Sequence, residues 1–573
     1  MHSLPRLPRL MEPIPGRFER LYGPERAASC VDRLRMMIGR YGVGPSSDAE
    51  RPWQTEDAVL IAYPDAIRTE GEAPLATLRR FLDERTPGLF NTVHLLPFFP
   101  YSSDDGFSVI HYRHVRSDLG TWSDLEDIAA GGRRLMVDLV INHTSRESNW
   151  FRDYVLGIAP GRDYFIEITP DMDLSRVVRP RTSDLATPVH TRLGDRKIWT
   201  TFSADQIDLN FSNPDVLFEF LDLLFLYYSH GARLFRLDAI AYLWKKSGTG
   251  CIHLPQTHEI VALIRDVLSL AMPDAALVTE TNVPHEENIS YFGHGQEARM
   301  VYQFTLPPLL LHTLLAGDAR PLADWVSHLK DPPPGCTFMN FTASHDGIGV
   351  RPLEGILPDH AVEALADHVR ACGGDVSMRR AARGQDRPYE LNTTYTDALG
   401  KPGEPGELHL ARFLCAQTIS CALQGVPAIY FNSLVAAPND HALARHTGRA
   451  RSLNRTLWTE ADLAARLNDP ASRAAATLQG FRRRLRARTT CEAFHPHGRQ
   501  EVLATGPSVF GLDRSSPDGT VRVRALHNIS AEPVRVPGGA APGAHEDLIS
   551  GAQYKGGDIR LAPYQSVWLR PLG

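Results

Sequence analysis

The stretch GARLFRLDAIAY, residues 231–242, is a short apolar run interrupted by Arg236 and Asp238. It follows VLFEFLDLLFLYYSH, residues 216–230, which is apolar but carries two acidic residues. Those charges argue against a membrane span and favour a buried helix that runs into a strand. A helix followed by an apolar strand is the repeating unit of a parallel βαβ sheet, whose strands are buried on both faces. The region therefore predicts a strand inside an α/β protein.

The same pattern recurs along most of the chain. Each further run ends in polar, Gly or Pro residues and precedes an amphipathic segment. The clearest runs are DAVLIAYP (57–64), NTVHLLPFFP (91–100), RRLMVDLVINH (133–143), DAALVTETN (274–282) and CTFMNFTASHD (336–346). No GxGxxG phosphate turn follows the first run, so the number and spacing of the runs favour a barrel over an open sheet. We predict an α/β fold, a (β/α)8 TIM barrel with inserted loop domains and a C-terminal antiparallel β domain.

The alternation of strands and helices also sets the expected domain boundaries. Two irregular, polar spans interrupt it and are expected to be domains inserted in barrel loops. After about residue 488, short strand-like runs replace the helices, which indicates a small antiparallel β domain. The predicted parts are an Arg-rich extension (1–54, partly helical around 25–41), the barrel (55–144, 211–346 and 404–488), an inserted B domain (145–210), a second inserted loop domain (347–403) and the C-terminal β domain (489–573).

Composition limits the class of protein. The 573 residues exceed what one ordinary core fills, and the net charge of −6 gives no electrostatic reason to expect nucleic acid or a membrane as a partner. The seven cysteines are scattered and form no CxxC pair, so we expect free thiols in a reducing cytoplasm. The N-terminal residues contain no apolar run long enough for a signal peptide. We therefore expect a soluble, cytoplasmic protein of several domains.

Polar side chains stand at the carboxyl ends of the predicted strands, where barrel enzymes place their active sites. They are Asp138, Asn142, His143, Arg236, Asp238, Glu280, His345 and Asp346. A single Asp after a strand is more often a turn or N-cap residue, but that interpretation explains the whole set poorly. Converging carboxylates suggest glycosidic chemistry, in which one attacks the anomeric carbon, one protonates the leaving oxygen and one stabilises positive charge. Arg236 lies two residues before Asp238, so both face one side of the strand and the cation keeps the aspartate ionised.

Four segments carry a resemblance to a known family. They are DLVINH (138–143), FRLDAIAY (235–242), LVTETN (277–282) and TASHDG (342–347), and they resemble the four conserved regions of the α-amylase family, glycoside hydrolase family 13. The resemblance covers nearly all of the chain after about residue 55.

This resemblance assigns roles to the polar strand ends. It implies that Asp238 is the nucleophile, Glu280 the general acid/base and Asp346 the stabiliser of the transition state. It further implies a glucose subsite and a supporting shell, with Arg236, His143 and His345 lining the subsite and Asp138 and Asn142 supporting the strand end.

Two further segments resemble the sucrose-phosphorylase subfamily. They are HLLPFFPYSSDDGF (94–107) and SHDGIGV (344–350). The resemblance implies that Asp104, with Phe107 beside it, holds the outer hydroxyls of glucose, and that Arg451 in GRARSLNR (448–455) does the same. Such contacts close the far side of the subsite, so that the enzyme removes one terminal glucose. Without the family match, Asp104 and Asp105 read as a solvated turn and Arg451 as a surface helix residue.

The subfamily also uses phosphate as the attacking group. The resemblance places an Arg and two Tyr residues on the acceptor side, at Arg181, Tyr242 and Tyr389, with Arg181 and Tyr389 binding phosphate. Arg suits this role because its planar fork binds phosphate oxygens in pairs. Inorganic phosphate is then a co-substrate, and we expect no cofactor and no metal ion, while an amylase-type calcium site is an alternative that the sequence leaves open. Composition and spacing do not distinguish phosphate from water as the acceptor.

Two departures from the subfamily pattern bear on the substrate. Asn282 stands where sucrose phosphorylases typically have His, and Glu390 where they typically have Gln. Both positions touch the fructose or phosphate side, so sucrose becomes a poor candidate. The segments ETNVPH (280–285), GTGCIHL (248–254) and RPYELN (387–392) resemble the glucosylglycerate-phosphorylase group instead. Glycerate is an anion, and Glu390 would repel it unless Arg181 or Lys246 offsets the charge.

The resemblance thus implies a retaining glycoside phosphorylase acting on a small α-glucoside, with glucosylglycerate as the favoured donor. Glucosylglycerol, sucrose and sucrose 6'-phosphate remain alternative donors, and an α-glucoside hydrolase remains an alternative reaction. A non-catalytic carbohydrate-binding relative is a further alternative, which the three intact carboxylates disfavour. The sequence leaves the oligomeric state open between a monomer and a homodimer.

Overall fold

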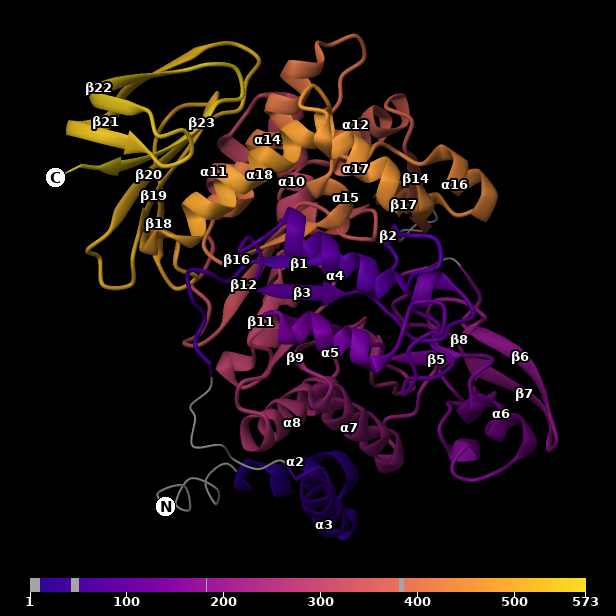
Figure 1. Cartoon of the computed structure of the whole chain (residues 1–573). Coiled ribbons are helices and arrows are strands. Elements are labelled where there is room, and N and C mark those ends of the chain that lie inside the picture. The colour runs from indigo at the N-terminus through magenta and orange to yellow at the C-terminus, as the bar shows by residue number, and fades with distance from the viewer. Residues whose placement is uncertain (1–10, 43–50, 182, 381–385, 573) are drawn as a thin grey trace.

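Eight parallel strands close into a barrel in the computed structural model, which describes residues 11–42, 51–181, 183–380 and 386–572 (Figure 1). Around the barrel the strands follow the order β1, β16, β12, β11, β10, β9, β4, β3. Their bounds are β1 Val59–Ala62, β3 Thr92–Leu95, β4 Arg134–Leu139, β9 Ala232–Leu237, β10 Ala276–Thr279, β11 Met300–Tyr302, β12 Thr337–Phe341 and β16 Val426–Tyr430. The predicted α/β barrel is confirmed.

Six of the eight strands lie in the six apolar runs recognised in the sequence. The other two, β11 and β16, were not recognised. β11 has three residues, too few to stand out as a run. β16 contains Pro427, and a proline is unusual inside a central strand because it lacks a backbone N–H. Pro427 is nevertheless paired in register with Asn340 of β12.

Helices cover the outside of the barrel. α7 (Pro214–Ser229) precedes β9, and it begins at a clear signal. Asn213 accepts the backbone N–H of Asp215, and Pro214 occupies the first turn, where no N–H partner is needed. The other long helices around the barrel are α4 (Pro74–Arg85), α5 (Trp122–Ala130), α8 (Pro255–Ala271), α10 (Leu306–Ala316), α11 (Arg320–Ser327), α14 (Gly406–Ala422), α17 (Glu460–Asn468) and α18 (Arg473–Thr489). Among the described residues, no helix has the length and apolarity to cross a membrane.

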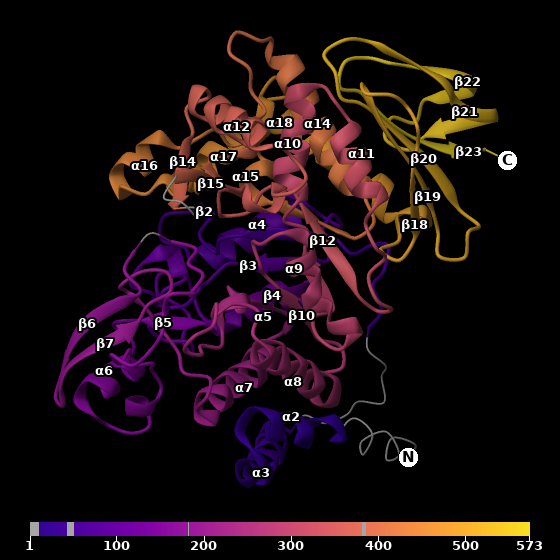
Figure 2. The same ribbon diagram turned by 180° about the vertical axis from the view of Figure 1, so that it is seen from behind.

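Two insertions stand beyond the carboxyl ends of the barrel strands. The first holds the antiparallel pair β5 (His143–Ser145) and β8 (Gln206–Asp208), the hairpin of β6 (Ala186–Thr191) and β7 (Gly194–Trp199), and α6 (Asn149–Leu156). The second holds a three-stranded sheet in the order β13 (Ile348–Gly349), β15 (Asp386–Asn392), β14 (Asp375–Arg380), with α12 (Asp359–Ala371). The lobe with α6, β6 and β7 projects to one side of the barrel in both views (Figures 1 and 2). Short helices α13 (Tyr395–Ala398), α15 (Phe431–Leu434) and α16 (His441–Thr447) follow the second insertion.

The N-terminal extension contains two helices, α2 (Pro13–Tyr22) and α3 (Pro24–Tyr41), that lie against α7 and α8 on the outside of the barrel (Figure 2). The sequence predicted helix only around 25–41, so α2 is an addition. The ring of Phe18 stacks on that of Phe218 with 5.9 Å between centroids. Arg17 forms ion pairs with Glu259, at 3.0 Å, and with Asp266 of α8. Residues 1–10 and 43–50 of the predicted extension, and 381–385 of the second insertion, lie outside the described residues.

The C-terminal part is a six-stranded antiparallel sheet with its own small core. Its strands follow the order β18 (Arg499–Val502), β19 (Val509–Ser515), β20 (Arg522–Asn528), β23 (Ser566–Pro571), β21 (Val534–Asp547), β22 (Gln553–Leu561). Buried arginines join it to the barrel: Arg514 donates to the carbonyl oxygen of Ala422 at 2.6 Å, and Arg488 donates to that of Phe494 at 3.2 Å.

Candidate active site

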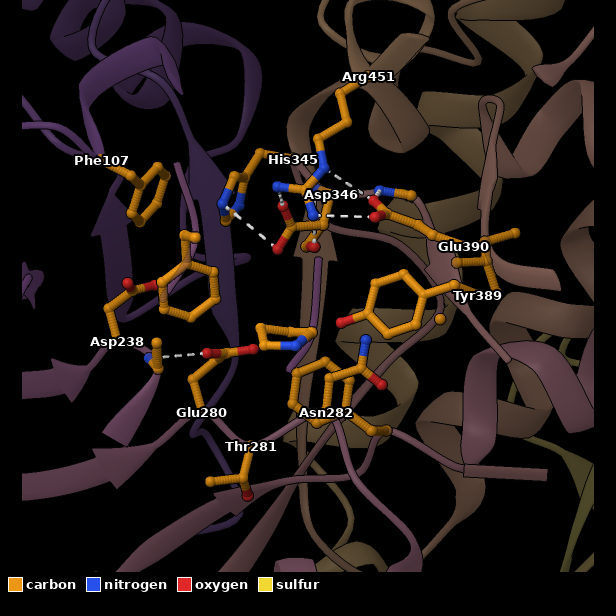
Figure 3. A pocket seen from close by; sticks show the side chains of 18 of the residues that line it. Phe107, Asp238, Glu280, Thr281, Asn282, His345, Asp346, Tyr389, Glu390 and Arg451 are labelled. Carbon is orange, nitrogen blue, oxygen red and sulfur yellow. Dashed lines mark hydrogen bonds and ion pairs between the residues drawn. The ribbon is translucent and has the colours of Figure 1, made fainter. Parts of the chain in front are cut away.

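A cavity of about 1050 Å3, its open mouth included, lies at the carboxyl ends of the barrel strands. The structure brings the predicted site residues together there (Figure 3). Those that line the cavity are Asp104, Phe107, His143, Arg181, Asp238, Tyr242, Glu280, Asn282, His345, Asp346, Tyr389, Glu390 and Arg451. Arg236 lies beneath the lining and is 2% exposed.

The floor of the cavity is built on β9 and β4. The two-residue period of β9 turns Arg236 and Asp238 to the same side, and Arg236 Nη1 lies 2.9 Å from Asp238 Oδ1. Arg236 also forms an ion pair with Asp138, whose other oxygen lies 2.9 Å from Nε2 of His94. Asp138 is therefore a buried partner that orients the arginine, as expected of a supporting residue.

Glu280 lies beside Asp238, at the end of β10. One of its carboxylate oxygens accepts the backbone N–H of Ala239 at 2.9 Å. That N–H is aimed by a left-handed backbone at Ala239, with φ of 49°, a conformation that is uncommon for alanine and that recurs at active sites. The chain thus turns sharply after Asp238, and this turn brings a backbone N–H to the second carboxyl.

The two carboxyls share one electrostatic environment. Burial raises the pKa of Asp238 and of Glu280, Arg236 opposes the shift in each, and the charge of Glu280 raises the pKa of Asp238 further. The pair therefore holds one proton more readily than two isolated carboxyls do. Arg236 lies 2.9 Å from Asp238 but 4.0 Å from Glu280, so the negative charge is best stabilised on Asp238 and the proton on Glu280.

The third carboxylate, Asp346, is held between cations. Arg451 Nη1 lies 2.5 Å from its Oδ1, and Arg455 Nη2 lies 4.0 Å from the same oxygen. Burial disfavours its charge, but these guanidinium groups outweigh burial and hold the pKa of Asp346 below its usual range. Asp346 is therefore an anion at neutral pH, as a stabiliser of positive charge must be.

Phe107, His143 and His345, which were predicted to line a glucose subsite, contact one another or lie side by side. The ring of Phe107 stacks on that of His345, with centroids 4.7 Å apart and planes 7° apart. Burial, followed by the charge of Arg236, lowers the pKa of His345 well below its usual range, so this imidazole is neutral. His143 Nε2 lies 2.8 Å from the carbonyl oxygen of Phe107, and burial lowers its pKa too.

Glu390 is the residue whose charge was predicted to bear on the choice of acceptor. It is 2% exposed, and its two oxygens lie 2.8 and 2.9 Å from Nε and Nη2 of Arg451. One oxygen also accepts the backbone N–H of Gly347 at 2.7 Å. The charge of Glu390 is thus neutralised within the wall, and Lys246, which is exposed and outside the described cavity lining, is not what offsets it.

The two insertions supply the residues expected to bind phosphate. Arg181 comes from the first insertion, is 30% exposed and lies 3.7 Å from Glu390. Its guanidinium carbon is 6.0 Å from the ring centre of Tyr389, which comes from the second insertion. Tyr242 follows β9, and its ring meets that of Phe202 edge-on, with 5.5 Å between the ring centroids.

Asn282 lies against the second insertion. Its Oδ1 is buried without a hydrogen-bond partner among the described residues. A Cβ on Gly349 would lie 2.2 Å from its Nδ2, so the amide and the glycine pack in direct contact. The orphaned oxygen in a cavity wall leaves Asn282 able to accept a hydrogen bond from a ligand.

Several residues at the site were not predicted from the sequence, and three of them contact predicted site residues: Gln206, Phe202 and Arg455. Gln206 lines the cavity and donates to Asp104 at 3.2 Å, and Phe202 lines it as well. Both come from the irregular first insertion, where no periodicity marks them. Arg455 donates from Nε to the carbonyl oxygen of His345 at 3.0 Å. The signal for Arg455 was present, because it lies four residues after Arg451 in the same segment.

Comparisons with known proteins agree with this geometry. Residues 89–325 match the family described as "Alpha amylase, catalytic domain". The chain is 45% identical to the glucosylglycerate phosphorylase of Allomeiothermus silvanus, over 96% of each chain. It is 40% identical to the glucosylglycerate phosphorylase of Escherichia coli, over 91% of this chain and 93% of that one. A solved sucrose 6F-phosphate phosphorylase from Thermoanaerobacter thermosaccharolyticum has the same fold, with a TM-score of 0.72 and 24% identity over 83% of this chain and 94% of that one. The chain belongs to the α-amylase family, glycoside hydrolase family 13.

Proposed function

We propose that the protein is a retaining glycoside phosphorylase that transfers glucose from 2-O-α-glucosylglycerate to inorganic phosphate and releases α-glucose 1-phosphate. The observation that carries the proposal is the contrast between two arginines of one cavity. Arg451 is engaged by Asp346 and Glu390, whereas Arg181 is 30% exposed beside a carboxylate that Arg451 already neutralises. Arg181 is thus available to an incoming anion. The relatives named glucosylglycerate phosphorylase support the choice of donor.

The proposed mechanism uses the three carboxylates in turn. Asp238 attacks C1 of glucose while protonated Glu280 donates to the glycosidic oxygen, and glycerate leaves. Asp346 stabilises the positive charge that develops at the ring. Phosphate, bound by Arg181 and Tyr389, then attacks C1 of the β-glucosyl ester on Asp238, and Glu280 takes up the proton that phosphate releases. Two inversions give α-glucose 1-phosphate with net retention.

The glucose ring is proposed to sit between Phe107 and the carboxylates, with Asp104 and Arg451 on its outer hydroxyls. Asp104 suits this role because burial disfavours its charge while Arg451 and Arg455 lower its pKa, so it remains an anionic acceptor. His143 and neutral His345 supply further donors at the same wall. These contacts limit the subsite to one terminal glucose.

Glycerate as the leaving group is consistent with the charges of the acceptor side. Glu390 would repel a carboxylate if it were free, but its ion pair with Arg451 and the N–H of Gly347 remove that repulsion. Arg181 then offers a cation within the same space. Neutral leaving groups such as glycerol or fructose make no use of that cation.

The test is reaction with and without phosphate. The purified enzyme is incubated with 2-O-α-glucosylglycerate, and α-glucose 1-phosphate and free glucose are measured. We expect α-glucose 1-phosphate to form only when phosphate is added, and free glucose to stay low both with and without phosphate. Release of free glucose at the same rate without phosphate would identify a hydrolase and overturn the proposal.

The leaving group is tested by synthesis in reverse. α-Glucose 1-phosphate is offered with glycerate, glycerol, fructose, fructose 6-phosphate or glucose, and phosphate release is followed. Glycerate should give the highest kcat/KM. Arg181→Gln should lower kcat/KM for glycerate much more than kcat/KM for glycerol, because this ratio leaves out the reaction of α-glucose 1-phosphate that both acceptors share. Equal rates with glycerate and glycerol would contradict the role of the anion site.

The proposed reaction needs phosphate as a co-substrate and no metal or organic cofactor, because side chains of the chain perform every proton transfer. Dialysis against EDTA followed by assay in metal-free buffer should leave the rate unchanged. A loss of activity that added Ca2+ restores would show that a metal supports the site.

A further inference from the structure

We infer that Asp105 and Arg455 form an ion pair that positions Asp104 in the glucose subsite. Neither belongs to the cavity lining, and each acts through a neighbour. The inference rests on the proposed function, in which Asp104 holds the outer hydroxyls of glucose.

The turn that carries Asp104 has a backbone that most residues avoid. Asp104, Asp105 and Gly106 have φ of 53°, 48° and 110°, three positive values in succession. Asp tolerates this region better than most residues, but it still costs free energy that the surroundings must offset. A Cβ on Gly106 would lie 2.7 Å from that of Pro97, so glycine is required there. Without anchors, the turn would relax and rotate the carboxylate of Asp104.

Asp105 is anchored by two arginines of unequal burial. Its Oδ2 forms an ion pair with Nη1 of Arg455, which is 5% exposed. Its Oδ1 lies 3.2 Å from Nη1 of Arg449, which is 43% exposed. Exposed pairs contribute little to stability because water screens them. Arg455 is therefore the anchor that holds the turn.

Arg455 is itself fixed by other strand ends of the barrel. Its Nε donates to the carbonyl oxygen of His345 at 3.0 Å, and its guanidinium carbon lies 5.8 Å from the ring centre of Tyr63. It therefore links the turn after β3 to the ends of β12 and β1. The same turn is held from the first insertion by Asp205, which accepts the hydroxyls of Ser102 and Ser108 at 2.6 and 2.7 Å.

Asp105 is closer to the substrate contact than these serines. It is the residue next to Asp104, so any change in its φ or in its side-chain anchor is passed directly to the carboxylate that faces the cavity. The carboxylate of Asp104 itself accepts a weaker hydrogen bond, from the amide of Gln206 at 3.2 Å. Asp105 is thus a positioning residue. Its replacement should weaken binding of the outer glucose hydroxyls and not the chemical step at C1.

The experiment is a double-mutant cycle with two donors. Asp104→Ala, Asp105→Asn and the double variant are assayed with α-glucosyl fluoride and with 4-deoxy-α-glucosyl fluoride, which lacks an outer hydroxyl. Asp105→Asn keeps a residue that tolerates the left-handed region and removes only the charge. For Asp105→Asn, we expect kcat/KM for α-glucosyl fluoride to fall about tenfold, mainly through a rise in KM, as when one charge-assisted hydrogen bond is weakened. For the same variant, kcat/KM for the 4-deoxy donor should fall much less. In the Asp104→Ala background, Asp105→Asn should lower kcat/KM little further.

A second variant and a matched control guard the test against misfolding. Arg455 also lies 4.0 Å from Asp346, and Arg455→Lys keeps a positive charge near that carboxylate. Because lysine cannot reach Asp105 and His345 together, the variant should show the same dependence on the 4-hydroxyl. The matched control is Asp118→Asn, which breaks an ion pair with Arg116 near the same loop. Asp118 is 58% exposed, so kcat/KM with both donors should stay unchanged. Thermal unfolding of each variant is measured alongside.

Three results would overturn the inference, and they separate it from the proposed function. If Asp105→Asn lowered kcat/KM equally for both donors, Asp105 would serve only the stability of the fold. A full additional loss from Asp105→Asn in the Asp104→Ala background would mean that the two act independently. If Asp104→Ala left kcat/KM unchanged for both donors, Asp104 would not contact glucose as the proposed function requires, and the inference would fail with it.

Discussion

Arg236 lies under the cavity with its guanidinium between Asp138, Asp238 and Glu280. One cation among three carboxylates does not neutralise them, so a proton must remain in the group. The shorter contact to Asp238 keeps that proton on Glu280, which is the division of labour that a nucleophile and a general acid need.

Replacement of Glu280 should separate the two half-reactions. Glu280→Gln removes the acid, so kcat with 2-O-α-glucosylglycerate should fall by about 10²–10⁴-fold. α-Glucosyl fluoride needs no proton on its leaving group, and its burst of fluoride should be nearly preserved. Stopped-flow release of fluoride measures this step. An equal loss with both donors would remove Glu280 from the role of general acid.

The pH dependence follows from the raised pKa values of the pair. In the proposed mechanism the active form has Asp238 ionised and Glu280 protonated, so kcat/KM should fall both as acid protonates Asp238 and as base deprotonates Glu280. Because burial raises both pKa values, the maximum should lie above the pH range of ordinary carboxyls. The alkaline limb should be present with 2-O-α-glucosylglycerate and absent with α-glucosyl fluoride, which needs no proton on its leaving group, whereas the acid limb should appear with both donors. An alkaline limb that appears equally with α-glucosyl fluoride would belong to another group.

Residues at strand ends could be predicted from the sequence because an Asp or Glu that closes an apolar run stands out. Asp238, Glu280 and Asp346 were found in this way, and all three line one cavity. The charge state of the acceptor side could not be predicted. Glu390 and Arg451 are 61 residues apart in the sequence, and no local pattern reveals their ion pair.

At the scale of elements, β13 brings the second insertion against the barrel. It pairs with β15 through Ile348 and Leu391 and through Gly349 and Glu390. The register places Glu390 beside Arg451 and Gly349 against Asn282, so one short strand pairing aligns two acceptor-side residues.

This close contact predicts the effect of adding one methyl group. Gly349→Ala puts a Cβ within 3 Å of three atoms of Asn282, so the amide must move, at a cost of about 1–3 kcal/mol as for other overpacked sites. In the reverse reaction the KM for glycerate should rise, while fluoride release from α-glucosyl fluoride should stay near wild type. Gly406→Ala, where no atom lies within 4 Å, is the matched control. An unchanged KM for glycerate would place Asn282 outside the acceptor site.

Elements were predictable where the apolar run was long enough. β9 and β10 were found, whereas the three residues of β11 carry too little signal and Pro427 disguises β16. α2 escaped because its apolar side consists of few residues in an Arg-rich extension. Its burial depends on α7 and α8, which lie some two hundred residues further along the chain.

At the scale of the whole molecule, α2 and α3 lie against the outer side of α7 and α8 (Figure 2). Arg17 should matter for stability and not for catalysis. Its side chain is 10% exposed and pairs with Glu259 and Asp266, so Arg17→Ala should lower the free energy of unfolding by about 1.5–3 kcal/mol. Arg35→Ala, which breaks an ion pair between groups 64% and 69% exposed, should change it by less than about 1 kcal/mol.

Urea unfolding and kcat are measured for both variants. A large fall in kcat for Arg17→Ala at temperatures where it stays folded would show that the helices communicate with the cavity.

Arg181, partly exposed at the cavity wall, has a consequence for the kinetics. If glycerate and phosphate both depend on this guanidinium, each excludes the other, and the enzyme must release one before it admits the next. Double-reciprocal plots at several phosphate concentrations should then be parallel, the pattern of a ping-pong reaction. The same cation is also accessible before any donor has bound. Phosphate at high concentration should therefore occupy the empty enzyme, compete with glucosylglycerate and slow the reaction that it drives at lower concentration.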